Sequence, residues 1–364
     1  MIRVPIAVAP CSYEAVIESG VLPRSGDILK ELVGASRRVF IVTVAPVHRK
    51  WGKRLTASLA AAGFAFDLLE MPMGERYKRL ATLERLAELL VKRGADRSAV
   101  IVAFGGGVVG DVVGLLASLY MRGVALVQIP TTVQAQVDAA IGGKTGVNLK
   151  TGKNLIGTFH QPRVVVIDPA VLSTLTEREF RAGLYESLKC GVIGRPELFL
   201  QLEKIRIKAL RRDREALEWV IAESVRLKAE VVSADERESG LRQVLNFGHT
   251  IGHALEAATN YRHFLHGEAV AWGMIAAADI AAAVGKLDRG DAQRIRRAVL
   301  SFGPLPAVEV RSQRVLHLLQ ADKKTRDGVV HFVLPTEIGK VEIVKDVPAP
   351  IVREAVDGLR RQSS

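Results

Sequence analysis

Residues Ala99-Val-Ile-Val-Ala-Phe104 and Gly105-Gly-Gly-Val-Val-Gly-Asp111 follow one another directly, and an apolar helical pattern then continues to Met121. The first stretch is a continuous apolar run, typical of a strand that is buried on both faces of a sheet. The second is a glycine-rich turn before a helix, where backbone N–H groups can hold a phosphate. This succession predicts an α/β fold with a ligand-binding turn at the end of the strand.

The chain on either side repeats this alternation of apolar strands and helices. We expect further strands at 38–43, 64–71, 125–129 and 164–167, and helices at 55–62 and 81–93. Alternation of this kind predicts a mainly parallel sheet covered by helices. After about residue 170 helical periodicity dominates, with short extended segments only at 329–334 and 341–344. The sequence therefore predicts a nucleotide-binding α/β domain over residues 1–170 and an all-α domain over residues 171–364.

Composition narrows the class of partner. The formal charge of +12 fits a nucleic acid, a membrane surface or an anionic small molecule, but aromatic residues make up only 5% of the chain, which disfavours base stacking. The basic run 204–214 has the spacing of an exposed helix face. We expect no nucleic-acid partner and no membrane span. Cys11 and Cys190 are too far apart in sequence for a CxxC site, and a cytoplasmic location fits.

The glycine turn has two interpretations. Gly105, Gly107 and Gly110 satisfy the GxGxxG pattern, yet no acidic residue lies about 20 residues further on, within 128–132. Glycine-rich turns between a strand and a helix are also common for packing reasons alone. A nucleotide site is favoured over a purely structural turn, although the pattern is not the usual dinucleotide fingerprint.

Four of the eight histidines lie between His249 and His266, which indicates a metal site. His249 and His253 are four residues apart and share a helix face, but Thr250 replaces the glutamate that a zinc protease requires. We expect His263 at the surface. Glu186, in a mostly apolar helix, is a candidate third ligand because a buried carboxylate needs a partner.

Several cations stand outside charge runs. Lys144 and Lys153 are flanked by glycines, which suggests loops approaching an anion. The text before Lys144 does not match a P-loop, because Asp138 occupies the position of its first glycine. Lys189, Lys228 and Arg242 stand in similarly distinctive text.

Taken together, these motifs resemble the 3-dehydroquinate synthase family. The similarity extends from about Gly74 to Lys340 and includes ten segments in the same order. These are 74–78, 105–111, 120–123, 130–132, 137–148, 152–162, 186–189, 241–256, 265–270 and 322–324. The resemblance implies an N-terminal NAD-binding α/β domain, a helical C-terminal domain and a homodimer.

The resemblance also assigns residues to two cofactors, NAD and Zn²⁺ or Co²⁺. The implied metal ligands are Glu186, His249 and His266. The implied NAD contacts are Glu75, Lys78, Gly106, Gly107, Val108, Asp111, Thr131, Thr132, Lys144, Lys153, Thr174 and Glu179. The implied substrate-site and proton-handling residues are Arg122, Asp138, Lys144, Lys153, Asn154, Lys189, Lys228, Arg242, Asn246, His253 and Lys324, with Lys323 an alternative to Lys324.

The implied substrate is a small sugar phosphate, 3-deoxy-D-arabino-heptulosonate 7-phosphate, whose phosphate and carboxylate suit a cationic pocket. The implied reaction is oxidation at carbon 5, elimination of phosphate, reduction and aldol closure, without net redox change. Two positions depart from the family: Val44 stands where an acid is usual, and Tyr185-Glu-Ser-Leu-Lys189 replaces Ala-Glu-Val-Ile-Lys. Another sugar phosphate cyclase and a metal-dependent polyol dehydrogenase are the alternative functions.

Overall fold

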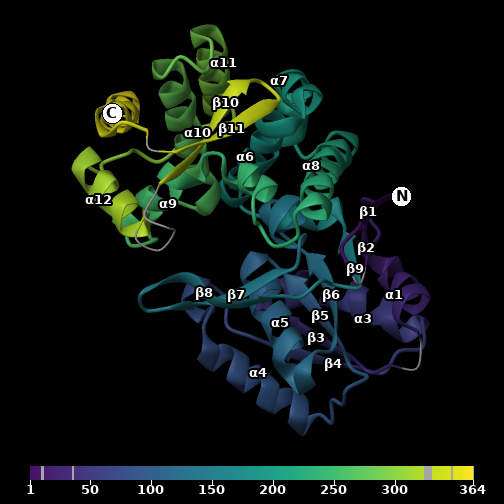
Figure 1. Ribbon diagram of the computed structural model, residues 1–364. Helices are drawn as coiled ribbons and strands as arrows, with labels where there is room; N and C mark the ends of the chain where they lie inside the picture. Colours follow the sequence, from purple (N-terminus) through teal and green to yellow (C-terminus); the bar gives the residue numbers. More distant parts are fainter. Residues whose placement is uncertain (10–11, 35–36, 324–329, 346, 364) are drawn as a thin grey trace. The chain divides into compact units, whose positions relative to one another are not determined.

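The computed structural model describes residues 1–9, 12–34, 37–323, 330–345 and 347–363. The chain forms two compact units (Figure 1). The first unit comprises Met1–Thr176 and Leu217–Arg237, and the second comprises Glu177–Ala216 and Glu238–Ser364. Helix α8 (Arg214–Ala234) therefore gives most of its length to the first unit, although it lies within the range 171–364 that the sequence analysis assigned to the helical domain.

The first unit is built on a seven-stranded sheet in the order β1-β2-β9-β6-β5-β3-β4. Neighbouring strands run parallel except β1 and β2, which pair antiparallel. The strands are β1 (Ile2–Ile6), β2 (Tyr13–Ile17), β3 (Val39–Thr43), β4 (Phe66–Glu70), β5 (Val100–Gly105), β6 (Ala125–Pro130) and β9 (Val164–Ile167). The predicted parallel sheet is confirmed, and β1 and β2 are additional strands that the sequence analysis did not predict.

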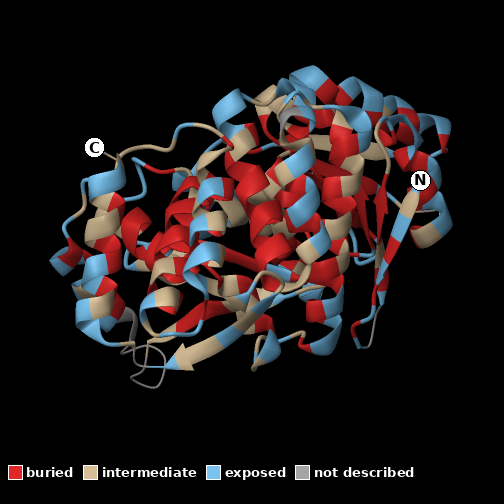
Figure 2. Ribbon diagram, turned by 90° about the horizontal axis from the view of Figure 1, so that it is seen from above, coloured by how far each residue is buried: buried red, intermediate tan, exposed pale blue. Residues whose placement is uncertain are grey.

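An apolar core covers each face of this sheet. One core joins the sheet to α1 (Ser25–Val33) and α3 (Lys53–Ala61), and the other joins it to α4 (Leu80–Lys92) and α5 (Gly107–Leu119). Successive residues of a strand point to opposite faces, so Ile41 belongs to the first core and Val42 to the second. Burial on both faces explains the continuous apolar runs, and Figure 2 shows buried residues along these strands.

A separate antiparallel pair, β7 (Lys144–Leu149) and β8 (Gly152–Phe159), packs beside α5 in the same unit. The expectation that Lys144 and Lys153 lie in loops is therefore wrong, because both are strand residues. Glycine permits this pairing: a Cβ on Gly157 would lie 2.1 Å from the carbonyl oxygen of Thr145 on the opposite strand. Of the glycines near Lys144, Gly146 also faces the opposite strand, where a Cβ would lie 3.1 Å from the carbonyl oxygen of Ile156.

The second unit is mainly helical. Its helices are α6 (Glu177–Gly194), α7 (Pro196–Leu210), α9 (His249–Ala258), α10 (His266–Ala283), α11 (Arg289–Leu300), α12 (Ser312–Lys323) and α13 (Ala349–Ser363). The strands β10 (His331–Glu337) and β11 (Lys340–Lys345) form an antiparallel pair near the expected extended segments, so the unit is not purely α-helical. In the part of the chain that the structure describes, no helix combines the length and apolarity needed to cross a bilayer.

Helix α10 is buried nearly all round and contacts α6, α9, α11 and α13. Two glycines permit its closest approaches. A Cβ on Gly267 would lie 1.8 Å from the carbonyl oxygen of Ala182 in α6, and a Cβ on Gly273 would lie 1.8 Å from that of Gly248, which precedes α9. These contacts hold the N-terminal ends of α9 and α10 beside α6, where the predicted metal ligands lie.

Candidate functional site

The three predicted metal ligands come together in the second unit. His249 is the first residue of α9, His266 is the first residue of α10, and Glu186 lies in the middle of α6. The Glu186 carboxylate is buried, with its side chain 1% exposed. Its Oε1 lies 3.5 Å from Nε2 of His266 and 3.9 Å from Nε2 of His249.

These distances fit a shared metal ion. Ligands about 2.1 Å from a tetrahedral metal are separated from one another by about 3.4 Å. The two carboxylate oxygens of Glu186 accept no hydrogen bond of standard geometry within the described residues, although Nζ of Lys189 lies 2.6 Å from Oε2. Lys189 therefore compensates the charge at Oε2, while Oε1 faces the two imidazoles and is available to a metal. The donor set of one carboxylate and two imidazoles therefore suits Zn²⁺ or Co²⁺.

Hydrogen bonds at the far side of each imidazole orient it for metal binding. Nδ1 of His249 lies 3.1 Å from the carbonyl oxygen of Phe247, and Nδ1 of His266 lies 3.0 Å from Oε2 of Glu256. A proton on each Nδ1 donates to these oxygens and leaves the Nε2 lone pair for a metal. Burial, helped by nearby Lys189, also holds the pKa of His249 well below its usual value, which favours the neutral ring.

His253 lies in the same cluster. The nitrogen atoms that His249, His253 and His266 can offer all lie within 4.8 Å of one another, and the His253 ring is exposed. Two ligand sets are therefore geometrically available, one with Glu186 and one with His253. His263 stands outside the cluster, exposed as predicted, with Nε2 2.9 Å from the carbonyl oxygen of Ala307.

Buried cations and polar groups lie on the elements around these ligands. Lys189, one helical turn after Glu186, is 2% exposed, and Arg242, in the short helix η7 (Leu241–Asn246) before α9, is 1% exposed. Nδ2 of Asn246 donates to Oε1 of Glu238 at 2.8 Å. Lys189 compensates the charge of the Glu186 carboxylate, and this compensation lowers the cost of burying both charged groups in the second unit.

In the first unit, the glycine turn joins β5 to α5. Gly105 ends β5, Gly106 precedes the helix, and Gly107 is its first residue. A Cβ on Gly106 would lie 3.0 Å from Cγ2 of Thr132, and the N–H of Thr131 donates to the carbonyl of Gly105. The turn and the end of β6 therefore form one surface at the N-terminus of α5, where unpaired N–H groups favour a phosphate.

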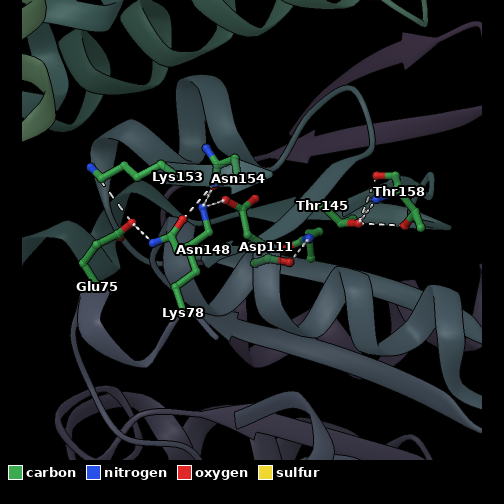
Figure 3. A network of polar contacts seen from close by, with 10 residues as sticks. Glu75, Lys78, Asp111, Thr145, Asn148, Lys153, Asn154 and Thr158 are labelled. Carbon is green, nitrogen blue, oxygen red and sulfur yellow. Dashed lines mark hydrogen bonds and ion pairs between the residues drawn. The ribbon is translucent and has the colours of Figure 1, made fainter. Parts of the chain in front are cut away.

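A polar network flanks this turn (Figure 3). Nζ of Lys78 lies 2.5 Å from Oδ2 of Asp111 in α5 and also donates to Oδ1 of Asn154 in β8. Oε1 of Glu75 accepts from Nδ2 of Asn148 at 2.8 Å and lies 4.0 Å from Nζ of Lys153. Burial raises the pKa of Asp111, and Lys78 opposes that shift. The network joins α5 to the β7–β8 pair.

Lys228 and Asp138 are 90 residues apart in sequence and meet in this unit. Nζ of Lys228, in α8, contacts Oδ1 of Asp138 and lies 2.5 Å from its carbonyl oxygen. Lys228 is 6% exposed. Asp138 belongs to the short helix η5 (Ala135–Ala139) that follows Thr131 and Thr132. The return of α8 to the first unit therefore places a predicted substrate cation beside the loop after β6.

The remaining predicted residues are Arg122, Thr174, Glu179 and Lys324. Arg122 follows α5 at the opposite end from Gly107, about 20 Å along the helix axis, and is exposed. Thr174 ends the short helix η6 (Pro169–Thr174) and accepts from Nε1 of Trp51 at 3.1 Å. Glu179 lies in the first turn of α6. Lys324 is outside the described residues, as is the side chain of Lys323.

One residue at the metal site was not predicted. Glu256 lies seven residues after His249 on the same face of α9 and is 3% exposed. An acidic residue on an apolar helix face was the only sign of it in the sequence. Its partner, His266, comes from a different helix, so the contact itself could not be read from the periodicity of α9.

Comparisons with known proteins cover almost the whole chain. The family described as 3-dehydroquinate synthase N-terminal matches residues 68–182, and the family described as 3-dehydroquinate synthase C-terminal matches residues 183–325. A relative from Koribacter versatilis, named 3-dehydroquinate synthase, is 53% identical over 360 residues, covering 99% of this chain and 98% of the relative.

Solved structures of related enzymes share the fold. The 2-epi-5-epi-valiolone synthase ValA from Streptomyces hygroscopicus subsp. jinggangensis 5008, with NAD⁺ and Zn²⁺ bound, has a TM-score of 0.88 at 32% identity and covers 98% of this chain and 99% of its own. A 2-deoxy-scyllo-inosose synthase complexed with carbaglucose-6-phosphate, NAD⁺ and Co²⁺ has a TM-score of 0.87 at 26% identity, with 99% of both chains covered. Both structures hold a dinucleotide and a divalent metal.

Proposed function

The chain belongs to the 3-dehydroquinate synthase family, and on that premise we propose that it converts 3-deoxy-D-arabino-heptulosonate 7-phosphate to 3-dehydroquinate and inorganic phosphate. The observation that carries the proposal is the buried carboxylate of Glu186, which lacks a hydrogen bond of standard geometry within the described chain and faces Nε2 of both His249 and His266. Together the carboxylate and the two imidazoles form a donor set for a divalent metal, and the family name supplies the reaction that the metal would serve.

Two cofactors are part of the proposal. Glu186, His249 and His266 would hold Zn²⁺ or Co²⁺, the ions present in the two related synthase structures. When bound, the metal and NAD supply Lewis acidity and reversible hydride transfer at a substrate alcohol. Lys189 beside Glu186 offsets the carboxylate charge and fixes its orientation before a metal arrives.

The glycine turn and its network would bind the dinucleotide. The N-terminus of α5 at Gly107 presents N–H groups to the pyrophosphate, and Lys78 adds a buried positive charge beside Asp111. The proposed NAD residues are Glu75, Lys78, Gly106, Gly107, Val108, Asp111, Thr131, Thr132, Lys144, Lys153, Thr174 and Glu179.

Cations and a histidine would bind and activate the substrate. Lys228, held by Asp138, and the buried Arg242 are suited to the phosphate and carboxylate of the sugar acid. His253 is exposed beside the two proposed histidine ligands, where an imidazole can exchange protons with the substrate. The proposed substrate residues are Arg122, Asp138, Lys144, Lys153, Asn154, Lys189, Lys228, Arg242, Asn246, His253 and Lys324.

We also propose that the chain acts in the cytoplasm as a homodimer. The resemblance to the family supports the dimer, and sedimentation equilibrium of the purified chain tests it by mass. A single species at 39.5 kDa would contradict it.

Phosphate release is the decisive assay. The purified chain, supplied with NAD and Zn²⁺ or Co²⁺, should release phosphate from the heptulosonate phosphate, form dehydroquinate and accumulate no NADH. Failure to release phosphate with the metal content verified would contradict the proposal. Release from the substrates of valiolone or scyllo-inosose synthases instead would favour a sister cyclase, and net NADH from a simple polyol would favour a dehydrogenase.

A further inference from the structure

Glu70 at the end of β4 and His48 in the segment after β3 form a polar pair that has no role in the proposed function. Thr43 of β3 is in register with Glu70 of β4, and β3 also pairs with β5, whose end forms the glycine turn. The carboxyl edges of these three parallel strands are therefore continuous. In open α/β sheets this edge is where ligands bind.

A dinucleotide lying on this edge needs a partner for the hydroxyls of its adenosine ribose. An acidic residue on the strand next to the glycine turn commonly serves as that partner. Here β3 is that strand, and the residue that follows it is Val44, which is apolar and 7% exposed. The usual position therefore offers no carboxylate.

The end of the neighbouring strand, β4, does carry a carboxylate, that of Glu70. Oε1 of Glu70 lies 2.5 Å from Nδ1 of His48, a residue of the segment that follows β3, and the two side chains are 43% and 41% exposed. Glu70 is two strand spacings from β5, about 9.6 Å, and its two methylene groups span part of that distance. We propose that Glu70, held in place by His48, binds the 2′-hydroxyl of the adenosine ribose of NAD.

The surroundings of the pair support this assignment. Lys50 and Trp51 follow His48 in the short helix η2 (His48–Gly52), and both contact Thr174: Nζ of Lys50 lies 3.5 Å from its carbonyl oxygen and Nε1 of Trp51 lies 3.1 Å from its hydroxyl. Thr174 is itself a proposed NAD residue. The segment carrying His48 therefore lies beside a second part of the proposed dinucleotide site.

The test compares two proteins with two ligands: the unmodified chain and Glu70→Gln, each with NAD and with NAD that lacks the adenosine 2′-hydroxyl. Calorimetry on the whole chain measures the four affinities. Loss of a hydrogen bond to a charged group should weaken NAD binding by about tenfold in Glu70→Gln. NAD that lacks the adenosine 2′-hydroxyl should bind the unmodified chain and Glu70→Gln equally. His48→Ala, which keeps the carboxylate but frees it, should weaken NAD binding less than Glu70→Gln does.

Glu31→Gln is the matched control, because Glu31 forms an exposed ion pair with Arg3 in the same unit. It should leave NAD affinity unchanged. The assignment of Glu70 is overturned if Glu70→Gln binds NAD as tightly as the unmodified chain does, or if the variant loses equal affinity for NAD and its 2′-deoxy analogue. The assignment of Glu70 rests on the proposed function, but different results contradict each. If the unmodified chain binds no NAD, the proposed function itself is contradicted.

Discussion

Glu256 and His266 form a contact between two helices, in which Oε2 of Glu256 in α9 lies 3.0 Å from Nδ1 of His266 at the start of α10. Glu256 is 3% exposed and therefore accepts this hydrogen bond in a low-dielectric environment. The contact sets which nitrogen of His266 carries the proton, and it directs the Nε2 lone pair toward Glu186. Glu256 is thus a positioning residue for the proposed metal site.

Replacing this carboxylate should weaken metal binding without removing a ligand. Glu256→Gln should raise the dissociation constant for Zn²⁺ by about tenfold, because contacts of this kind contribute 10- to 100-fold and an amide oxygen still accepts. Competition with a zinc-binding dye measures the constant. Glu203→Gln, which breaks a half-buried pair with Arg294 in the same unit, is the control and should bind Zn²⁺ normally. Equal affinities in the two variants would remove Glu256 from this role.

The choice between the two available ligand sets is tested by metal content. We expect His249→Ala and Glu186→Gln to purify without stoichiometric metal, because each loses one of three ligands. His253→Ala should keep its metal while losing activity, and His263→Ala should keep both. Metal analysis of the four variants by mass spectrometry gives the answer. Loss of metal in His253→Ala, together with its retention in Glu186→Gln, would assign the site to the three histidines instead.

The sequence predicted elements more successfully than it predicted contacts. The strands β3, β5 and β6 were predicted because burial on both faces leaves continuous apolar runs. The β7–β8 pair was missed, since its glycines permit close strand packing but are equally typical of loops. The contact of Lys228 with Asp138 spans 90 residues, and the return of α8 to the first unit leaves no local pattern in the chain.

The same distinction holds at the metal site. The histidine cluster was visible because His249, His253 and His266 are close in sequence, and the structure brings them together. The orientation of the His266 ring was not visible, since it depends on the side chain of Glu256 from another helix. Periodicity shows which face of a helix is buried, but it does not show what that face meets.

The ion pair of Lys78 and Asp111 should control stability in a pH-dependent way. Lys78→Met leaves the Asp111 carboxylate with less compensation, at a cost of about 2 kcal/mol in the free energy of unfolding at neutral pH. Burial already raises the pKa of Asp111, and the loss of Lys78 raises it further. An acid with a raised pKa in the folded state binds more protons folded than unfolded, so stability falls as pH rises through that window and recovers as pH falls.

Urea unfolding of Lys78→Met and the unmodified chain at pH 7.5 and 5.5 checks this behaviour. The stability difference should shrink at the lower pH, where the carboxyl group is more often neutral. The double variant Lys78→Met, Asp111→Asn should recover most of the lost stability, because it removes the uncompensated charge. A difference that is the same at both pH values would show that Lys78 contributes only through packing.

Close packing of α10 against the turn before α9 should be necessary for both stability and metal binding. A Cβ on Gly273 would lie 1.8 Å from the carbonyl oxygen of Gly248, and this contact is with backbone, which cannot rotate away. Gly273→Ala must therefore separate the two segments, at a cost of about 3 kcal/mol in the free energy of unfolding. Because His249 follows Gly248 directly and His266 begins α10, the same separation should weaken Zn²⁺ binding.

Gly240→Ala is the matched control, since a Cβ at Gly240 meets no heavy atom within 4 Å and its φ of −162° lies outside the left-handed region. Thermal unfolding and zinc titration of both variants separate the effects. Gly273→Ala should unfold at a lower temperature and bind Zn²⁺ more weakly, whereas Gly240→Ala should match the unmodified chain in both. If Gly273→Ala is destabilised but binds Zn²⁺ normally in its folded state, the spacing of α9 and α10 does not set the ligand geometry, and α6 with Glu186 must accommodate the shift.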